Sequence, residues 1–213
     1  MYAAIATRPD LSLAVGMLSQ YMQNPSNEHW VGIKRILRYI KGTLNYGLKF
    51  TYSDKFVLQG YSDADWAGEV ETRKSTSGYV FLLGNCCVSW RSKKQSIVAL
   101  SSTEAEYVSL CSAAQETIWL RNLLSSVGFE QTAPTVIHED NQGAIALSHN
   151  PKDHPRTKHI DIKYHFVRQT IEDNRVTLLY CPTERMVADT LTKGLSKPLF
   201  EGFRLQMGVD IVK

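Results

Sequence analysis

Acidic side chains stand at the ends of the predicted strands and in the predicted helices, where together they could bind metal ions. In sheets covered by helices, the carboxyl ends of the strands are the usual place for a functional site. The candidates are Asp63 at the end of strand 56–63, Glu104 or Glu106 in the first turns of helix 102–126, Asp140 at the end of strand 135–140, and Asp189 in helix 184–193.

The chemistry of such a set follows from its charge. Several carboxylates in one place repel one another, so burying them together requires cations. Oxygen ligands favour a hard ion such as Mg²⁺. Two such ions about 4 Å apart can activate water and stabilise the leaving oxygen of an in-line displacement at phosphorus. The set therefore indicates phosphodiester hydrolysis, although any one of these acids alone is more often a surface charge or a residue that favours a helix dipole.

At two of these positions a second acid nearby could be the functional one. Glu104 and Glu106 are two residues apart, so their side chains point about 200° apart on a helix. Each shares a helical stripe with apolar residues, and periodicity alone leaves the choice open. Asp65 lies on the same face of its strand as Asp63, because side chains alternate along a strand.

Charge is unevenly distributed along the 213 residues, with a net charge of +3. Lys and Arg outnumber Asp and Glu by 6 to 2 in residues 1–50 and by 11 to 8 in residues 151–213, whereas acids lead by 11 to 7 in residues 51–150. Basic flanks around an acidic middle suit a protein that holds metal ions and approaches a polyanion. Chance scatter would explain the same counts.

The cysteines and the opening segment indicate the compartment. Four cysteines occur without CxxC spacing, so reduced and mostly buried thiols are expected. Arg8, Pro9 and Asp10 interrupt the first apolar stretch, unlike a secretion signal, and no stretch reaches membrane-spanning length. An intracellular protein with no membrane partner is expected.

The pattern of apolar residues predicts an α/β fold. Helices are expected first, then three antiparallel strands, then alternating helices and strands that form a mixed sheet covered by helices. The predicted helices are 10–23, 27–42, 102–126, 142–148, 157–173 and 184–193, and the predicted strands are 56–63, 78–84, 86–92, 135–140 and 175–181.

Seven motifs occur in order between about residues 56 and 200: YSDADWAG, RKSTSGYVFLLG, SWRSKKQ, ALSSTEAEY, EDNQGAIAL, RTKHIDIKYHFVR and ADTLTKGL. Together they resemble the ribonuclease H domain at the end of the copia-type LTR retrotransposon Pol polyprotein. The upstream run from TRPDLSLAVG to LNYGL resembles the end of the reverse transcriptase of the same polyprotein. The resemblance implies a helical remnant of the reverse transcriptase thumb or connection at 1–50, a ribonuclease H-like domain at 51–195, and a C-terminal tail at 196–213.

The family's fold is a five-stranded mixed sheet flanked by helices, here with an N-terminal helical appendage. Its four catalytic and metal-binding carboxylates, carried over by motif, are Asp63, Glu106, Asp140 and Asp189. The implied activity is a two-metal endonuclease that cuts the RNA strand of RNA–DNA hybrids during reverse transcription, with Mg²⁺ or alternatively Mn²⁺. The implied partners are the hybrid and the reverse transcriptase region, in a cytoplasmic virus-like particle or in the nucleus.

Two other functions remain open. The chain starts partway through the reverse transcriptase resemblance and has no YxDD motif, so an inactive fragment that binds nucleic acid or protein is the main alternative. A nuclease or integrase of the same fold is the other, and the spacing of four acids argues against it.

A surface for nucleic acid is expected from basic and polar residues near the acids. Lys and Arg would contact phosphates without regard to base sequence, beside Trp90 at the end of a strand. Small polar side chains would contact 2′-hydroxyl groups. The expected nucleic-acid-binding residues are Arg73, Lys74, Arg91, Lys93, Lys94, Ser101, Ser102 and Asn141.

The sequence has no histidine at the position where the family resemblance suggests a catalytic one. Many cellular ribonucleases H carry a histidine in a loop just before the last catalytic Asp, and residues 181–188 contain none. Either the metal ions and water suffice, or His159 or His165 comes near. Together with His154, these histidines lack zinc-binding spacing and cysteine partners.

Overall fold

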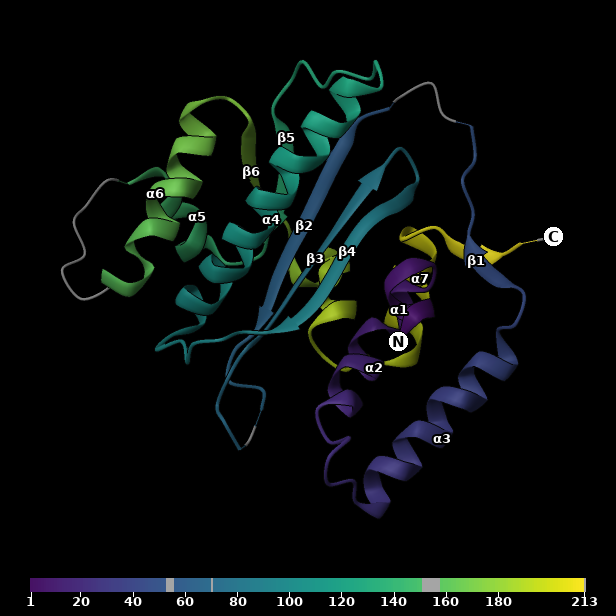
Figure 1. The fold of residues 1–213 in the computed structure, drawn as a ribbon. Coiled ribbons are helices and arrows are strands. Elements are labelled where there is room, and N and C mark those ends of the chain that lie inside the picture. The colour runs from purple at the N-terminus through teal and green to yellow at the C-terminus, as the bar shows by residue number, and fades with distance from the viewer. Residues whose placement is uncertain (53–55, 70, 151–157, 213) are drawn as a thin grey trace.

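The computed structural model describes residues 1–52, 56–69, 71–150 and 158–212, and its centre is a five-stranded sheet (Figure 1). The strand order is β4-β3-β2-β5-β6, with the first three strands antiparallel and the last three parallel. The five-stranded mixed sheet that the sequence and its family resemblance predict is confirmed. Its strands are β2 (Leu58–Asp65), β3 (Thr76–Leu83), β4 (Cys86–Lys94), β5 (Thr135–Glu139) and β6 (Val176–Tyr180).

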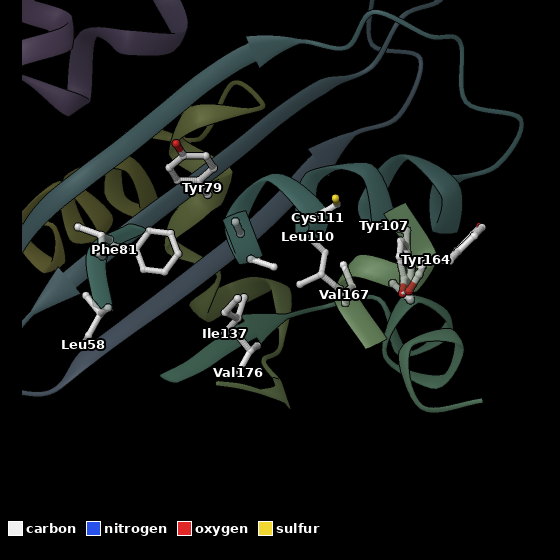
Figure 2. Packing of buried hydrophobic residues seen from close by; sticks show 14 of the residues in the cluster. Leu58, Tyr79, Phe81, Tyr107, Leu110, Cys111, Ile137, Tyr164, Val167 and Val176 are labelled. Atoms are coloured by element: carbon white, nitrogen blue, oxygen red, sulfur yellow. Dashed lines mark hydrogen bonds between the residues drawn. The ribbon is translucent and has the colours of Figure 1, made fainter. Parts of the chain in front are cut away.

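One face of this sheet is covered by α4 (Ser102–Ser126), α5 (Gln142–His149) and α6 (Lys158–Glu172). The core on this face is built from apolar side chains of the strands and of α4 and α6, and Figure 2 shows them in contact. Tyr107 and Tyr164 lie with their ring centroids 4.4 Å apart where α4 meets α6. The predicted bounds of the long helix, 102–126, are confirmed.

The opposite face is covered by the short 3-10 helix η3 (Val187–Leu191) and by α7 (Lys197–Gln206), and the exposed 3-10 turn η2 (Thr183–Arg185) precedes η3. The single helix predicted over 184–193 is therefore wrong. Met186 between the two turns has an extended conformation (φ −78°, ψ 92°), which interrupts helical hydrogen bonding. Met186 and Leu191 are both buried in a second core on this face, so packing rather than helix propensity sets the path of this segment.

The two ends of the chain pack together. The N-terminal segment forms α1 (Tyr2–Ala6), η1 (Pro9–Leu11), α2 (Ser12–Ser19) and α3 (Asn27–Gly42). After α3, the strand β1 (Tyr46–Leu48) pairs with β7 (Val209–Ile211) near the C-terminus. Residues 196–213, expected as a tail, thus contain α7 and β7, which contribute to the second core.

A buried ion pair ties the N-terminal helices to one another. The Arg8 guanidinium donates to both carboxylate oxygens of Asp10, at 3.0 and 2.8 Å, and to the Thr43 carbonyl at 3.1 Å. Tyr39 of α3 also donates to Asp10. The N-terminal helices are joined to the sheet by Trp90 of β4, which donates to the carbonyl of Ala4 at 2.8 Å.

All four cysteines are buried and unpaired, as expected for reduced thiols. Among the described residues, no helix has both the length and the apolar content needed to span a bilayer.

Candidate active site

Asp63 lies on β2 and points to the face covered by η3. Its register partner on β3 is Gly78, and a side chain at Gly78 would collide with Thr192 and Leu191. The missing side chain lets η3 and the turn after it lie directly against the sheet beside Asp63. There the Thr192 hydroxyl donates to Asp63 Oδ2, and Asp63 is only 1% exposed.

Glu106 comes from the first turns of α4. The side chain of Ser101 accepts the backbone N–H of Glu104 at 3.1 Å and caps this helix. Glu104 is turned back toward the loop before the helix, where its Oε2 accepts the Leu100 N–H at 2.8 Å. Farther along α4, the Ser109 hydroxyl donates to the Asp63 carbonyl at 2.8 Å, which fixes the helix against β2.

Asp140 directly follows β5 and precedes α5, whose N-terminus is capped by Asn141. The hydroxyl of Thr183 donates to Asp140 Oδ2 at 2.8 Å. Asp63, Glu106 and Asp140 each offer one carboxylate oxygen, and these oxygens lie within 4.8 Å of one another. Three acids that are 43 and 34 residues apart in sequence therefore converge, and Glu106 rather than Glu104 belongs to the group.

Asp189 lies on η3, which packs against β2 and β3, and is 1% exposed. It is outside the group of three oxygens, and Lys193 joins it to that group. The Lys193 ammonium lies 3.1 Å from Asp189 Oδ1 and 3.5 Å from Asp63 Oδ1. All four predicted carboxylates therefore lie in one region: three have oxygens close to one another, and the fourth, Asp189, lies directly beside Asp63 and shares Lys193 with it.

Burial and mutual repulsion oppose the ionisation of these acids. Burial, followed by the charges of Glu139 and Asp63, raises the pKa of Glu106 to about 11. Burial and the charge of Asp63 raise the pKa of Asp189 to about 7, against the lowering effect of Lys193. Burial also raises the pKa of Asp63. One ammonium is too little positive charge for this many buried carboxylates, so further cations would stabilise their ionised forms.

The residues present fit divalent cations. The donors are carboxylate oxygens, which suit a hard ion. Glu106 Oε2 and Asp189 Oδ2 are buried, and neither makes a hydrogen bond. A buried carboxylate oxygen without a partner is costly, and a bound cation would satisfy it.

Three residues near the acids were not found by sequence reasoning. Glu139 is fully buried, with Oε1 accepting the Asn141 N–H at 3.3 Å and Oε2 without a hydrogen bond. Its position beside Asp140 in the EDNQ motif was the available signal. Thr192 and Lys193 belong to the ADTLTKGL motif, but a helix predicted there gave no reason to aim them at Asp63.

Asp65, the rival to Asp63, takes another position. It pairs in register with Thr76 at the end of β2. Its carboxylate packs against Gly68, where a Cβ atom would overlap it. Asp65 therefore supports the turn after β2 and lies outside the group of three acids.

The residues predicted to bind nucleic acid fall into two groups. Ser101 and Asn141 cap α4 and α5, so their side chains already have structural hydrogen bonds. Lys94 forms an ion pair with Glu69 and donates to Gln20 at 3.2 Å. Arg73, Arg91, Lys93 and Ser102 are exposed, as is the capping Ser101, and Lys74 is half-buried.

Of the candidate histidines, His165 has a described side chain, and its ion-pair partner is not one of the four acids. His165 is exposed on α6 and lies 3.5 Å from Asp161, one helical turn away. The side chain of His159 and the whole of His154 lie outside the described residues. His138 stacks on Tyr61 of β2, with ring centroids 4.4 Å apart.

Known sequences resemble this chain over almost its full length. The retrovirus-related Pol polyprotein of transposon RE2 from Arabidopsis thaliana is 45% identical over 203 residues, which is 95% of this chain and 14% of that protein. The Pol polyprotein of transposon TNT 1-94 from Nicotiana tabacum is 45% identical over 201 residues, covering 94% and 15%. The chain therefore spans only a small part of these relatives.

A shorter relative and a solved structure are also similar. The secreted RxLR effector protein 161 of Plasmopara viticola is 59% identical over 120 residues, covering 56% of this chain and 84% of that protein. Among solved structures, LC11-RNase H1 aligns with a TM-score of 0.49 and 16% identity, covering 64% of this chain and 93% of the other. No protein-family model matches the chain.

Proposed function

Since this chain belongs to the family of copia-type retrotransposon Pol polyproteins, we propose that it is a metal-dependent endonuclease that cuts the RNA strand of RNA–DNA hybrids. The observation that carries the proposal is the convergence of Asp63, Glu106 and Asp140, whose oxygens lie within 4.8 Å of one another. Asp189 completes the set through Lys193. The proposed setting is reverse transcription of the element.

The four carboxylates would hold two Mg²⁺ ions, with Mn²⁺ as an alternative. When bound, such ions supply the positive charge and the acidified water that an in-line displacement at phosphorus requires. The chain's own part is to fix the donors. Thr192 orients Asp63, Thr183 orients Asp140, and Ser109 holds α4, which carries Glu106, against β2.

We propose that exposed basic residues of β4, the strand at one edge of the sheet, contact the substrate. Register places Ser92 of β4 in the same row as Gly78 and Asp63. Adjacent strands lie about 4.8 Å apart, so the backbone of β4 passes about 10 Å from Asp63. Arg91 and Lys93 flank Ser92 and are exposed. Because side chains alternate along a strand, they point to the sheet face opposite to that of Asp63, where they would contact phosphates of a hybrid that extends past this edge of the sheet.

The test is cleavage of a hybrid whose RNA strand is end-labelled. The purified full chain with Mg²⁺ should cut this RNA, and should leave the same RNA intact when it is single-stranded or paired with RNA. Asp140→Asn should abolish cleavage. The matched control is Glu172→Gln, which neutralises an exposed acid at the end of α6 and should keep full activity.

Other outcomes would select another function. Equal residual cleavage by wild type and Asp140→Asn would indicate a contaminating nuclease and overturn the proposal. Hybrid binding without cleavage, in Mg²⁺ and in Mn²⁺, would instead favour a binding module that has lost its chemistry.

A further inference from the structure

Lys193 is held beside the acids by its own backbone turn. Its N–H donates to the Asp189 carbonyl at 3.0 Å, and the hydroxyl of the preceding Thr192 donates to Asp63. The Lys193 side chain is therefore attached to the same turn that positions Asp189. Its ammonium lies between two carboxylates, 3.1 Å from Asp189 and 3.5 Å from Asp63.

Among the ion pairs of the described residues, Lys193 is the cation that neutralises these two acids. Asp63 and Asp189 are almost fully buried, whereas the Lys193 side chain is 34% exposed. The lysine thus reaches inward from the surface, and rotation of its flexible side chain can move the ammonium outward without unfolding the turn.

A divalent ion and this ammonium compete for the same space and for the negative charges of the same two carboxylates. Carboxylate oxygens approach Mg²⁺ to about 2.0–2.1 Å. An ion bound to both Asp63 and Asp189 would therefore lie close to the present position of the ammonium, where like charges repel. Both cannot occupy the space between the two carboxylates.

We propose that Lys193 is the built-in counter-ion of Asp63 and Asp189, and that divalent ions bind by displacing its ammonium from these carboxylates. The inference rests on the proposed metal-dependent function and adds a positioning residue to it. Lys193 keeps the two acids together before the ions bind and raises the ion concentration at which the site fills. The displaced ammonium lies at the exposed edge of the site.

The first test is Mn²⁺ binding to the full chain, measured from the electron paramagnetic resonance signal of free Mn²⁺. Lys193→Met keeps the length of the side chain and removes its charge. Because a cation beside a carboxylate changes its affinity for another cation by about tenfold or more, this variant should bind Mn²⁺ about tenfold more tightly. Lys193→Arg keeps the charge and should not bind more tightly. The matched control is Lys197→Met, since Lys197 is exposed on α7.

The second test needs no variant and remains available if Lys193→Met does not fold. Amine acetylation of the wild-type chain, followed by mass spectrometry, reports how accessible each lysine is. Adding saturating Mn²⁺ should increase acetylation of Lys193 several-fold and leave that of Lys197 unchanged.

The outcomes separate this inference from the proposed function. Equal Mn²⁺ affinity in wild type and Lys193→Met, or Lys193 acetylation that is unchanged or reduced by Mn²⁺, would overturn the displacement of Lys193 while leaving the metal centre in place. If neither the wild-type chain nor any variant bound Mn²⁺, both the metal centre and the displacement of Lys193 would be overturned.

Discussion

A methyl group added at Gly78 should separate the two parts of the candidate active site. Gly78 pairs with Asp63, and η3 lies against it without an intervening side chain. In Gly78→Ala, the new Cβ would be 2.6 Å from Thr192 Cγ2, 2.9 Å from Leu191 Cβ and 3.3 Å from the Ala188 carbonyl oxygen. Two of these neighbours are backbone or near-backbone atoms, so rotating one side chain does not remove the conflict.

The size of the effect follows from these distances. Ordinary contact begins near 3.4 Å, so the turn that carries Thr192 must retreat by about 0.8 Å, the difference from 2.6 Å. Overpacking of this kind costs about 1–3 kcal/mol of unfolding free energy. The same retreat moves Asp189 from Asp63, and a displacement of about 1 Å at a catalytic centre can cost on the order of 10²-fold in rate.

The measurement pairs urea unfolding with hybrid cleavage. The matched control is Gly202→Ala, because Gly202 lies within α7 and a Cβ there meets nothing within 4 Å. The control should keep its activity and gain up to about 1 kcal/mol, since Ala is the better helix former. If Gly78→Ala kept wild-type stability and cleavage, the close approach of η3 to β3 would not be what positions Asp189.

Three further changes probe other parts of the molecule. Glu106→Gln should reduce cleavage by at least about 10²-fold, whereas Glu104→Gln should keep most activity because an amide oxygen can still accept the Leu100 N–H in the loop before α4. The reverse order of activities would refute the assignment. Burial and Asp63 raise the pKa of Asp189 to about 7, so between about pH 4 and pH 7 the folded state binds more protons than the unfolded state. Stability of the ion-free protein, measured by urea unfolding with a chelator, should therefore fall as pH rises through this window, and the same measurement with Mg²⁺ in place of the chelator should show that Mg²⁺ restores more of this stability at the upper end. Arg8→Ala breaks the buried ion pair with Asp10 and removes the hydrogen bonds to Thr43 at the end of α3, and should cost about 3 kcal/mol; a thermal midpoint equal to wild type would contradict that role.

Local signals in the sequence predicted the elements that carry Asp63, Glu106 and Asp140. The start of α4 is set by the Ser101 cap, and the strands have the β-branched and aromatic residues that favour a sheet. Periodicity could not separate Glu104 from Glu106, because residues 104–111 are all buried. Residues 104–111 therefore have no exposed face, and a helix segment without an exposed face shows no amphipathic pattern.

The other misses involve contacts between distant parts of the chain. The β1–β7 pair joins two strands of three residues more than 150 positions apart, and such short strands have too few residues to show alternation. The segment 184–193 has helix-forming residues, yet it follows the sheet as two 3-10 turns because Met186 and Leu191 are both needed in the second core. The position of Lys193 beside the acids depends on the course of this segment, so the sequence alone could not predict it.

The position of Asp189 depends on parts of the chain far from the acids. The 3-10 helix η3 lies against Gly78 on the sheet and packs with Phe203 of α7 in the second core. Thr190, Lys193 and the two residues after Lys193 line a cavity of about 430 Å³ whose other walls come from η1, α2, α3 and α7. Tyr39 of α3 and Phe200 of α7 both line this cavity and make an edge-to-face contact, with ring centroids 5.9 Å apart. The segments outside residues 51–195 therefore enclose the turn that presents the fourth carboxylate, and the geometry of the acids is a property of the whole described chain.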